Sequence, residues 1–352
     1  MRPNIYSLYS LYSLYSLYSL YSLYSLYSFY SLYSFYSLYS FYSFYSFYSF
    51  YSFYSFYSLY KKQKTMIAAS ELIINQDGSV FHLHLRPDQV ADKLIVCGDP
   101  GRVDMIASFF DSVECEVSSR EFHTVTGTYK GKRLTALSHG IGPDNIDIVM
   151  TELDALKNID FQTREIKPVH TTLEIIRIGT CGGLQTDCPE GTALVSDVSI
   201  GFDGVLNWYA GRDSVSDLDF ERALTSYIGY PKHAADPYVV HADGELVSRF
   251  QGEAFRHGCT ISAVGFYGPQ GREVRLPLAS PMLNERVMQF EYEGRRVTNY
   301  EMESAALAGM ARLMGHKAVT VCLVIANRVA KRSNTGYKNG MHDLIPLVLE
   351  RL

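Results

Sequence analysis

Residues 173–183 read Leu-Glu-Ile-Ile-Arg-Ile-Gly-Thr-Cys-Gly-Gly, a short apolar run that stops at a cluster of glycines. The run has the length and composition of a buried strand, and the glycines are typical of the turn after one. Arg177 interrupts the apolar pattern. Because arginine is rarely buried without a partner, Arg177 is either half of a structural ion pair or a ligand for an anion.

The same arrangement recurs on both sides of this stretch, and it predicts an α/β fold. We expect strands at Lys93–Cys97, Leu134–Ser138, Leu173–Ile178, Ala193–Ile200 and Ala318–Ile325, and helices at Arg102–Phe110, from about Asp144 to Lys157 and at Glu301–Met314, with Gly315 as the stop of the last. Three of these strands run into glycine turns. Such turns favour anions, because backbone N–H groups and helix N-termini are exposed there.

The first 65 residues differ in composition from everything after them. Residues 6–60 repeat Tyr-Ser-Leu or Tyr-Ser-Phe without a break. A period of three fits neither a helical stripe nor strand alternation. We therefore expect residues 1–65 to be a low-complexity leader that is disordered or not native, with Met66 a natural start, and residues 66–352 to form a single folded domain.

Charge and cysteine content exclude several classes of protein. Beyond residue 65 the chain carries 28 basic and 37 acidic side chains, a net charge of −9, which argues against nucleic acid as a partner. Serine keeps every apolar run of the leader short, so no membrane span is expected. The six cysteines include no CxxC pair. We expect a reducing, cytoplasmic setting rather than a disulfide framework.

Five motifs then occur in a fixed order: Gly98-Asp99-Pro100-Gly101-Arg102, Arg120-Glu121-Phe122, Arg177-Ile178-Gly179-Thr180, Phe266-Tyr267-Gly268-Pro269-Gln270-Gly271-Arg272 and Asn299-Tyr300-Glu301-Met302-Glu303-Ser304. With these motifs the chain resembles the nucleoside phosphorylases, and among them those that act on uridine. The resemblance covers about Val80 to Arg328. It implies a three-layer α/β/α sandwich around a mixed, partly barrel-like sheet, and phosphate-dependent cleavage of uridine to uracil and ribose 1-phosphate in pyrimidine salvage.

The resemblance also implies a phosphate site made of Gly98, Arg102, Arg177 and Thr180. Arg120 would join it from a neighbouring subunit, in a homo-oligomer that is a dimer or a trimer of dimers. Arginine suits this task because its planar guanidinium binds two oxygens of an oxyanion. For Arg120 the alternative is an exposed charge.

Ribose recognition falls by resemblance to Glu303 and Met302, with His82 contributed across the subunit interface. The Glu-Met-Glu spacing predicts that Glu301 and Glu303 point in different directions at the start of a helix and do not share one task. His82 and His84 could share one strand face, as a metal pair would. No third ligand lies nearby in sequence, so no metal is expected and no cofactor either, with inorganic phosphate as co-substrate.

The base pocket carries the specificity. By resemblance it consists of Phe266, Gln270, Arg272 and Arg328. The amide of Gln270 offers a donor and an acceptor to the edge of uracil, and Arg272 donates to a carbonyl oxygen that gains charge as the bond breaks. Arg177, Arg272 and Glu303 are the expected catalytic residues. Many bacterial purine enzymes have Ser-Asp where this chain has Asn327-Arg328.

Other interpretations remain open. One is a purine nucleoside phosphorylase or a water-using nucleosidase of the same fold, although a phosphate site has no use in a hydrolase. Another is a non-catalytic protein that self-associates through its repeat. Cys181 adjoins the phosphate motif, but no cysteine-enzyme pattern accompanies it. The polar loop Lys331–Asn339 could cover the site.

Overall fold

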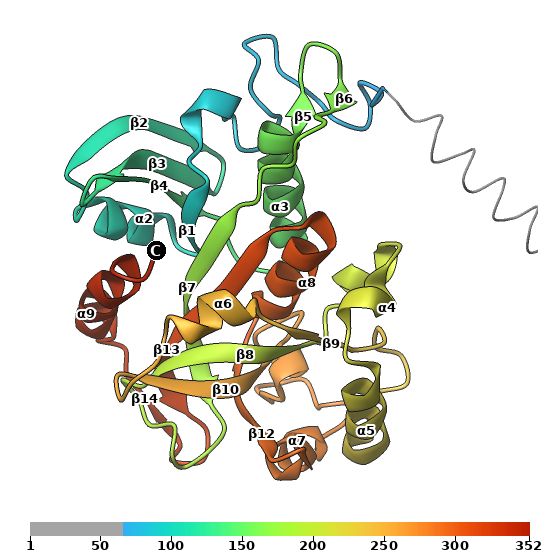
Figure 1. The fold of residues 1–352 in the computed structure, drawn as a ribbon. Helices are drawn as coiled ribbons and strands as arrows, with labels where there is room; N and C mark the ends of the chain where they lie inside the picture. Colours follow the sequence, from blue (N-terminus) through green and yellow to red (C-terminus); the bar gives the residue numbers. More distant parts are fainter. Residues whose placement is uncertain (1–65) are drawn as a thin grey trace, which may run out of the picture. The chain divides into compact units, whose positions relative to one another are not determined.

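A large mixed sheet organises the protein (Figure 1). The computed structural model describes residues 66–352, which form one compact unit. What the sequence predicts for residues 1–65 lies outside the described residues. The strands follow the order β11 (Glu291–Tyr292), β12 (Arg295–Glu301), β10 (Phe255–Ser262), β8 (Ala193–Gly201), β13 (Lys317–Asn327), β7 (Glu174–Gly183), β1 (Lys93–Cys97), β4 (Lys132–Ser138), β3 (Phe122–Tyr129) and β2 (Ser112–Ser119).

The sheet curls on itself without becoming a complete barrel. Strand β12 also pairs with β7, through Asn299 opposite Gly183 and Tyr300 opposite Gly182. The short strands β9 (Tyr238–His241) and β14 (Arg332–Ser333) extend it beside β8 and β13, and β5 (Ile159–Asp160) pairs with β6 (Glu165–Ile166) in a separate hairpin. The mixed, partly barrel-like sheet expected from the sequence is confirmed.

Helices cover both faces of the sheet and complete three layers. The helices are α2 (Pro100–Ala107), α3 (Pro143–Asn158), α4 (Arg212–Val215), α5 (Leu218–Ile228), α6 (Gly244–Ser248), α7 (Leu283–Gln289), α8 (Ser304–Met314) and α9 (Lys338–Leu349), with 3-10 turns at Pro87–Gln89, Val205–Trp208 and Gly268–Gln270. Successive residues of β1 point to opposite layers. Leu94 and Val96 belong to the core with α3 and α8, whereas Ile95 and Cys97 belong to the core with α2 and α9.

Several element boundaries differ from the sequence prediction, and two of these differences matter for the site. Strand β7 continues through Gly179 to Gly183 instead of stopping at Ile178, because β13 pairs with it along its whole length. Helix α8 begins at Ser304, so Glu301 ends strand β12 and Glu303 precedes the helix. The expectation that both glutamates lie within the helix was wrong.

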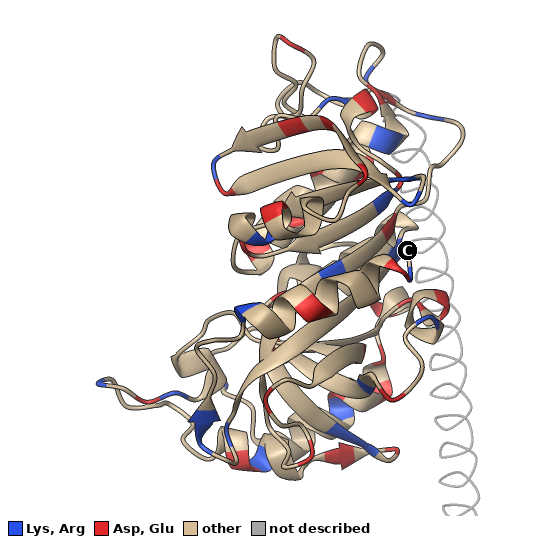
Figure 2. Cartoon of the chain, turned by 90° about the vertical axis from the view of Figure 1, so that its left-hand side faces the viewer, with Lys and Arg blue, Asp and Glu red and all other residues tan. Residues whose placement is uncertain are grey.

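The described part of the chain contains no helix with the length and apolarity that crossing a membrane requires. Its acidic and basic residues are intermingled over the fold (Figure 2). Unlike a basic stripe, this mixture offers no concentrated positive field for a phosphate backbone.

Candidate active site

A cavity of about 490 Å³ opens where strands β1, β4, β7 and β12 end. Nine of the residues predicted from the sequence line it: Gly98, Arg102, Arg177, Thr180, Phe266, Gln270, Arg272, Met302 and Glu303. They come from segments up to about two hundred residues apart in the chain. The fold therefore gathers the motifs of the sequence at one edge of the sheet, where anions and polar ligands are favoured.

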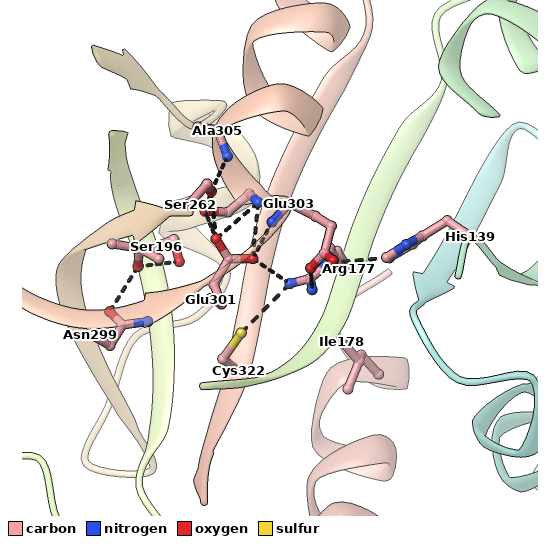
Figure 3. Close-up of polar contacts among 12 residues, drawn as sticks. His139, Arg177, Ile178, Ser196, Ser262, Asn299, Glu301, Glu303, Ala305 and Cys322 are labelled. Atoms are coloured by element: carbon pink, nitrogen blue, oxygen red, sulfur yellow. Dashed lines mark hydrogen bonds and ion pairs between the residues drawn. The ribbon is translucent and has the colours of Figure 1, made fainter. Parts of the chain in front are cut away.

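Arg177 is the centre of a buried ion cluster (Figure 3). Its Nη1 lies 3.0 Å from Glu301 Oε2, its Nη2 donates to Glu303 Oε2, and its Nε donates to His139 Nε2 over 3.2 Å. Burial by itself lowers the pKa of Arg177, but the carboxylates of Glu303 and Glu301 outweigh it and hold the pKa above its ordinary value. The guanidinium therefore stays charged.

Two carboxylates share this one guanidinium, so their charge is not fully compensated. Burial raises the pKa of Glu303, and the neighbouring Glu301 adds to that effect against the attraction of Arg177. One oxygen of Glu303 also accepts the backbone N–H of Gly142 over 2.7 Å. Glu303 is thus fixed from two sides while its side chain lines the cavity.

Glu301 also contacts Arg177, and in addition it makes contacts at the start of α8. Its carboxylate accepts the backbone N–H groups of Glu303 and Ser304 at 2.9–3.1 Å and the hydroxyl of Ser262 at 2.5 Å. It therefore satisfies the free donors at the start of α8. Glu301 holds Arg177 and caps the helix that follows Glu303.

Two glycines allow close packing at the cavity wall, one against Arg177 and one against the turn after β4. A Cβ on Gly179 would lie 2.5 Å from Arg177 Nη1, and a Cβ on Gly98 would lie 3.0 Å from the carbonyl oxygen of Gly140. Arg102 is buried, and its Nη1 donates to the carbonyl of Ile178 over 3.0 Å. The two arginines therefore flank the same stretch of β7.

The opposite end of the cavity is built from the motif 266–272. The guanidinium carbon of Arg272 lies 3.7 Å from the centre of the Phe266 ring, and its Nη1 donates to Gln270 Oε1 over 2.6 Å. Burial and the nearby charge of Arg328 lower the pKa of Arg272 to about 10. A half-buried cation of this kind gains stability from a negative charge placed beside it.

Arg328 lies behind this end of the cavity. Its Nη1 donates to the backbone carbonyl of Gln270, and its guanidinium carbon lies 5.2 Å from the ring centre of Tyr300, which lines the cavity. Its Nη2 is buried and has no hydrogen-bond partner among the described residues. A carbonyl oxygen of a ligand or a bridging water would satisfy this donor.

His82 and Arg120 lie away from the cavity within one chain. His82 Nδ1 is 2.6 Å from Glu152 Oε1, which also accepts the backbone N–H of His82. The guanidinium carbon of Arg120 is 5.8 Å from the ring centre of Phe81, and that ring packs edge-on against His82. The two residues expected to come from a neighbouring subunit thus occur together, around a partly exposed phenylalanine.

Sequence reasoning gave no site role to three further residues that line the cavity or lie beside it. Tyr300 and Tyr337 line the cavity, and His139 contacts Arg177. Tyr300 belongs to the motif Asn299–Ser304, and Tyr337 belongs to the loop Lys331–Asn339. In a sequence, however, a tyrosine that lines a cavity looks the same as one that packs in the core. Cys181 also lines the cavity; burial raises its pKa well above the ordinary value, so it is no ready nucleophile.

A second cluster, Asp154, His170 and His316, has the composition of a metal site, with ligand atoms within 4.8 Å of one another. His316 Nδ1 accepts the backbone N–H of Leu173, so its Nε2 carries the proton and faces Asp154 Oδ1 at 3.1 Å. A protonated Nε2 offers no lone pair to a metal. This cluster joins α3 to the starts of β7 and β13, far from the strand ends that form the cavity.

Comparison with known proteins assigns the family. The family model described as "Phosphorylase superfamily" matches residues 92–343. A uridine phosphorylase of Thermococcus kodakarensis is 29% identical over 262 residues, 72% of this chain and 79% of its own, and a DeoD-type purine nucleoside phosphorylase of Aliivibrio fischeri is 29% identical over 244 residues, 69% and 84%. A Trypanosoma brucei nucleoside phosphorylase crystal structure described as showing uridine phosphorylase activity superposes with a TM-score of 0.73 at 30% identity, over 80% of this chain and 99% of that one.

The chain belongs to the phosphorylase superfamily. Within it, the chain is a nucleoside phosphorylase, a pentosyltransferase that uses phosphate as co-substrate to cleave a nucleoside. Its relatives include both uridine and purine enzymes, so the base it accepts has to be argued from the cavity.

Proposed function

We propose that the chain is a uridine phosphorylase, which converts uridine and phosphate to uracil and ribose 1-phosphate. The observation that carries the proposal is the distribution of charge along the cavity. The end of the cavity formed by residues 266–272 offers the amide of Gln270 and the guanidinium of Arg272. The carboxylates of Glu301 and Glu303 lie instead around Arg177. Uracil presents carbonyl oxygens to such donors and needs no acid.

The leaving base takes up the electron pair of the broken bond. A phosphate oxygen forms a bond to C1′ as the bond between C1′ and N1 breaks, and the pair of electrons moves onto uracil. Negative charge then develops on the uracil oxygens, where Arg272 and the unpaired Nη2 of Arg328 are suited to stabilise it. Phe266, held under Arg272, supplies an apolar surface for the ring.

Phosphate belongs, in this proposal, at the opposite end, with Arg102, Arg177, Thr180 and the backbone of Gly98. Ribose lies between the two ends, against Met302, with its hydroxyls toward Glu303. The carboxylate of Glu303 contacts Arg177, so the groups for ribose and phosphate are held in one rigid cluster. No cofactor takes part in this scheme.

A second subunit completes the site in this proposal. We propose a homo-oligomer, a dimer or a trimer of dimers, in which the neighbour contributes Arg120 to phosphate and His82 to ribose. Their common position around Phe81 supports this, because one surface of the neighbour then delivers both. The six free cysteines fit a reducing compartment, and we place the reaction in the cytoplasm.

A purine nucleoside phosphorylase is the competing function, since purine enzymes are among the relatives. An acid that protonates the purine ring would be needed beside Gln270. Asn327, the neighbour of Arg328, is buried with its amide donating to the carbonyls of Gln185 and Cys188 at 2.9 and 2.8 Å, so it is not free to take that role.

Phosphate-dependent turnover of uridine and of inosine by the full-length protein distinguishes the two. We expect kcat/KM for uridine to exceed that for inosine by at least about a hundredfold, because a pocket built to hydrogen-bond its substrate can reject an unmatched one by about 10⁴–10⁵. Equal values, or a preference for inosine, would refute the assignment of the base pocket.

A further inference from the structure

His139 is a fully buried histidine that no motif of the sequence singled out. It stands directly after strand β4, at the start of the glycine turn 140–142. Its backbone N–H donates to the carbonyl of Cys97 over 2.8 Å, which ties it to the neighbouring strand end. Its Nε2 lies 3.2 Å from Arg177 Nε, and its Nδ1 has no hydrogen-bond partner among the described residues.

The direction of this contact fixes the chemical form of the histidine. Arginine nitrogens only donate hydrogen bonds, so His139 Nε2 must accept with a lone pair. A protonated imidazole has none. The contact therefore exists only while His139 is neutral with its proton on Nδ1.

Arg177 is held on three sides when this contact is included. His139 orients Nε, Glu301 lies next to Nη1, and Glu303 accepts from Nη2. The two carboxylates hold one edge of the guanidinium, and His139 fixes the plane from the other, which places the group against the cavity that Gly98 and Thr180 also line. Catalytic groups need this kind of support to stay in productive geometry.

We propose that neutral His139 is a positioning residue for phosphate: its Nε2 holds Arg177 in the orientation that binds the co-substrate, and protonation of His139 releases it. The inference rests on the phosphate site of the proposed function and adds a residue and a pH dependence to it. His139 does not touch the reacting atoms.

The surroundings of His139 oppose its protonation. The titratable and charged groups around it are Arg177 of β7, Arg102 of α2, the Cys97 thiol of β1, Glu121 against Gly140, and Glu303 at the far end of the turn. Burial and then the positive charge of Arg177 hold the pKa of His139 well below 6.5; the Gly140 backbone opposes them, and the charge of Arg102 adds a smaller lowering effect. His139 is therefore neutral at neutral pH, and the contact is intact there.

Two variants separate positioning from packing. His139→Gln keeps an oxygen acceptor at the reach of Nε2 but cannot titrate, whereas His139→Leu fills similar space without an acceptor. Binding of inorganic phosphate to the full-length proteins is measured by calorimetry and by the phosphate-induced rise in Tm. We expect His139→Leu to weaken phosphate binding about tenfold or more and His139→Gln to stay within about threefold of the wild type, the scale of one hydrogen bond to a charged group.

A pH series supplies a readout that packing alone would not move. The ionisation of phosphate itself is common to both proteins, so it cancels in the ratio of wild-type to His139→Gln affinity. That ratio should be constant near neutral pH and fall as the pH drops well below 6.5. This comparison remains decisive if His139→Leu does not fold.

Equal losses in the Leu and Gln variants, no loss in either, or a ratio that does not change with pH would overturn the proposal. Failure of the proposed function is recognised separately. Normal phosphate binding without turnover of uridine would refute the uridine assignment and leave the role of His139 standing. Absence of phosphate binding by the wild type would refute the phosphate site, and this inference with it.

Discussion

At the scale of single residues, the position of the Arg177 guanidinium requires glycine at position 179. An arginine inside an apolar strand needs polar partners, and the side chains of Glu301, Glu303 and His139 all contact Arg177 directly. The guanidinium folds back over Gly179, where a side chain would collide with it. The sequence left open whether Arg177 forms an ion pair or binds an anion; the structure shows the ion pair and also places Arg177 on the cavity wall.

Gly179→Ala should therefore damage phosphate binding. The added Cβ would lie 2.5 Å from Arg177 Nη1 and 2.8 Å from Cys322 Sγ, and overpacking of this kind lowers the free energy of unfolding by about 1–3 kcal/mol. We expect that loss in urea unfolding, with a raised KM for phosphate. Gly182→Ala in the same strand is the control, because its nearest non-neighbouring atom is 4.0 Å away. Equal effects of the two substitutions would contradict the steric argument.

The buried carboxyl group of Asp203 predicts how the stability of the protein depends on pH. Burial raises the pKa of Asp203 from 3.8 to about 6, although Val205 N–H and Tyr238 Oη donate to it. The folded chain thus binds this proton more tightly than the unfolded chain. The free energy of unfolding should fall as the pH rises from about 4 to about 6, by on the order of 3 kcal/mol at most.

Asp203→Asn keeps an acceptor for both donors and should lack this decline, so the variant gains stability relative to the wild type above pH 6. Urea unfolding at pH 4.5 and pH 7 measures the difference. Asp88→Asn, at an exposed side chain, controls for the lost negative charge. Parallel pH dependences for the wild type and Asp203→Asn would show that Asp203 titrates normally.

At the scale of elements, the link between β12 and α8 decides how Glu301 and Glu303 are placed around Arg177. Glu301 ends the strand, caps the helix through two backbone N–H groups and contacts Arg177. Sequence pattern could not show this. The run 301–314 has helical composition throughout, and only pairing of β12 with β10 and β7 keeps Glu301 in the sheet.

Removal of the Glu301 carboxylate should affect both stability and catalysis. Glu301→Ala leaves buried donors of α8 unpaired and one side of Arg177 without its partner, so we expect a loss of about 3–5 kcal/mol in the free energy of unfolding. Glu291→Ala, at an exposed glutamate of β11, should change it by less than about 0.5 kcal/mol. Thermal and urea unfolding check both, and a loss below 1 kcal/mol for Glu301→Ala would refute the capping role.

At the scale of the whole molecule, much of the fold follows from the sequence because its strands are short, strongly apolar and separated by glycine turns. The five predicted strands lie where the pattern places them, as β1, β4, β7, β8 and β13, whereas β10 and β12, which pair with each other in parallel, were not predicted. Strand β2 was not predicted because it is largely exposed and lacks an apolar run. Its partner β3 was not predicted either. Nine predicted site residues meet in one cavity. The contacts of Tyr300, Tyr337 and His139 depend on packing between distant segments, which no local pattern encodes.

The proposal that neighbouring subunits share a site predicts complementation between them. In an assembly of Arg120→Ala subunits, every site should lack the arginine that its neighbour contributes. In an assembly of Arg272→Ala subunits, every site should lack its own base-binding arginine. Co-expression of the two variants yields mixed assemblies in which some sites carry both native residues, about a quarter of all sites for random pairing into dimers. Phosphorolysis should recover to that order, whereas no recovery over either variant alone would mean that Arg120 does not cross the interface.

The most direct test of the account is the release of uracil from uridine by the full-length protein, followed with and without inorganic phosphate. The arrangement of Arg102, Arg177 and Arg272 predicts uracil and ribose 1-phosphate in equal amounts, only when phosphate is present. Uracil formed without phosphate, or no uracil alongside base release from inosine or adenosine, would contradict it.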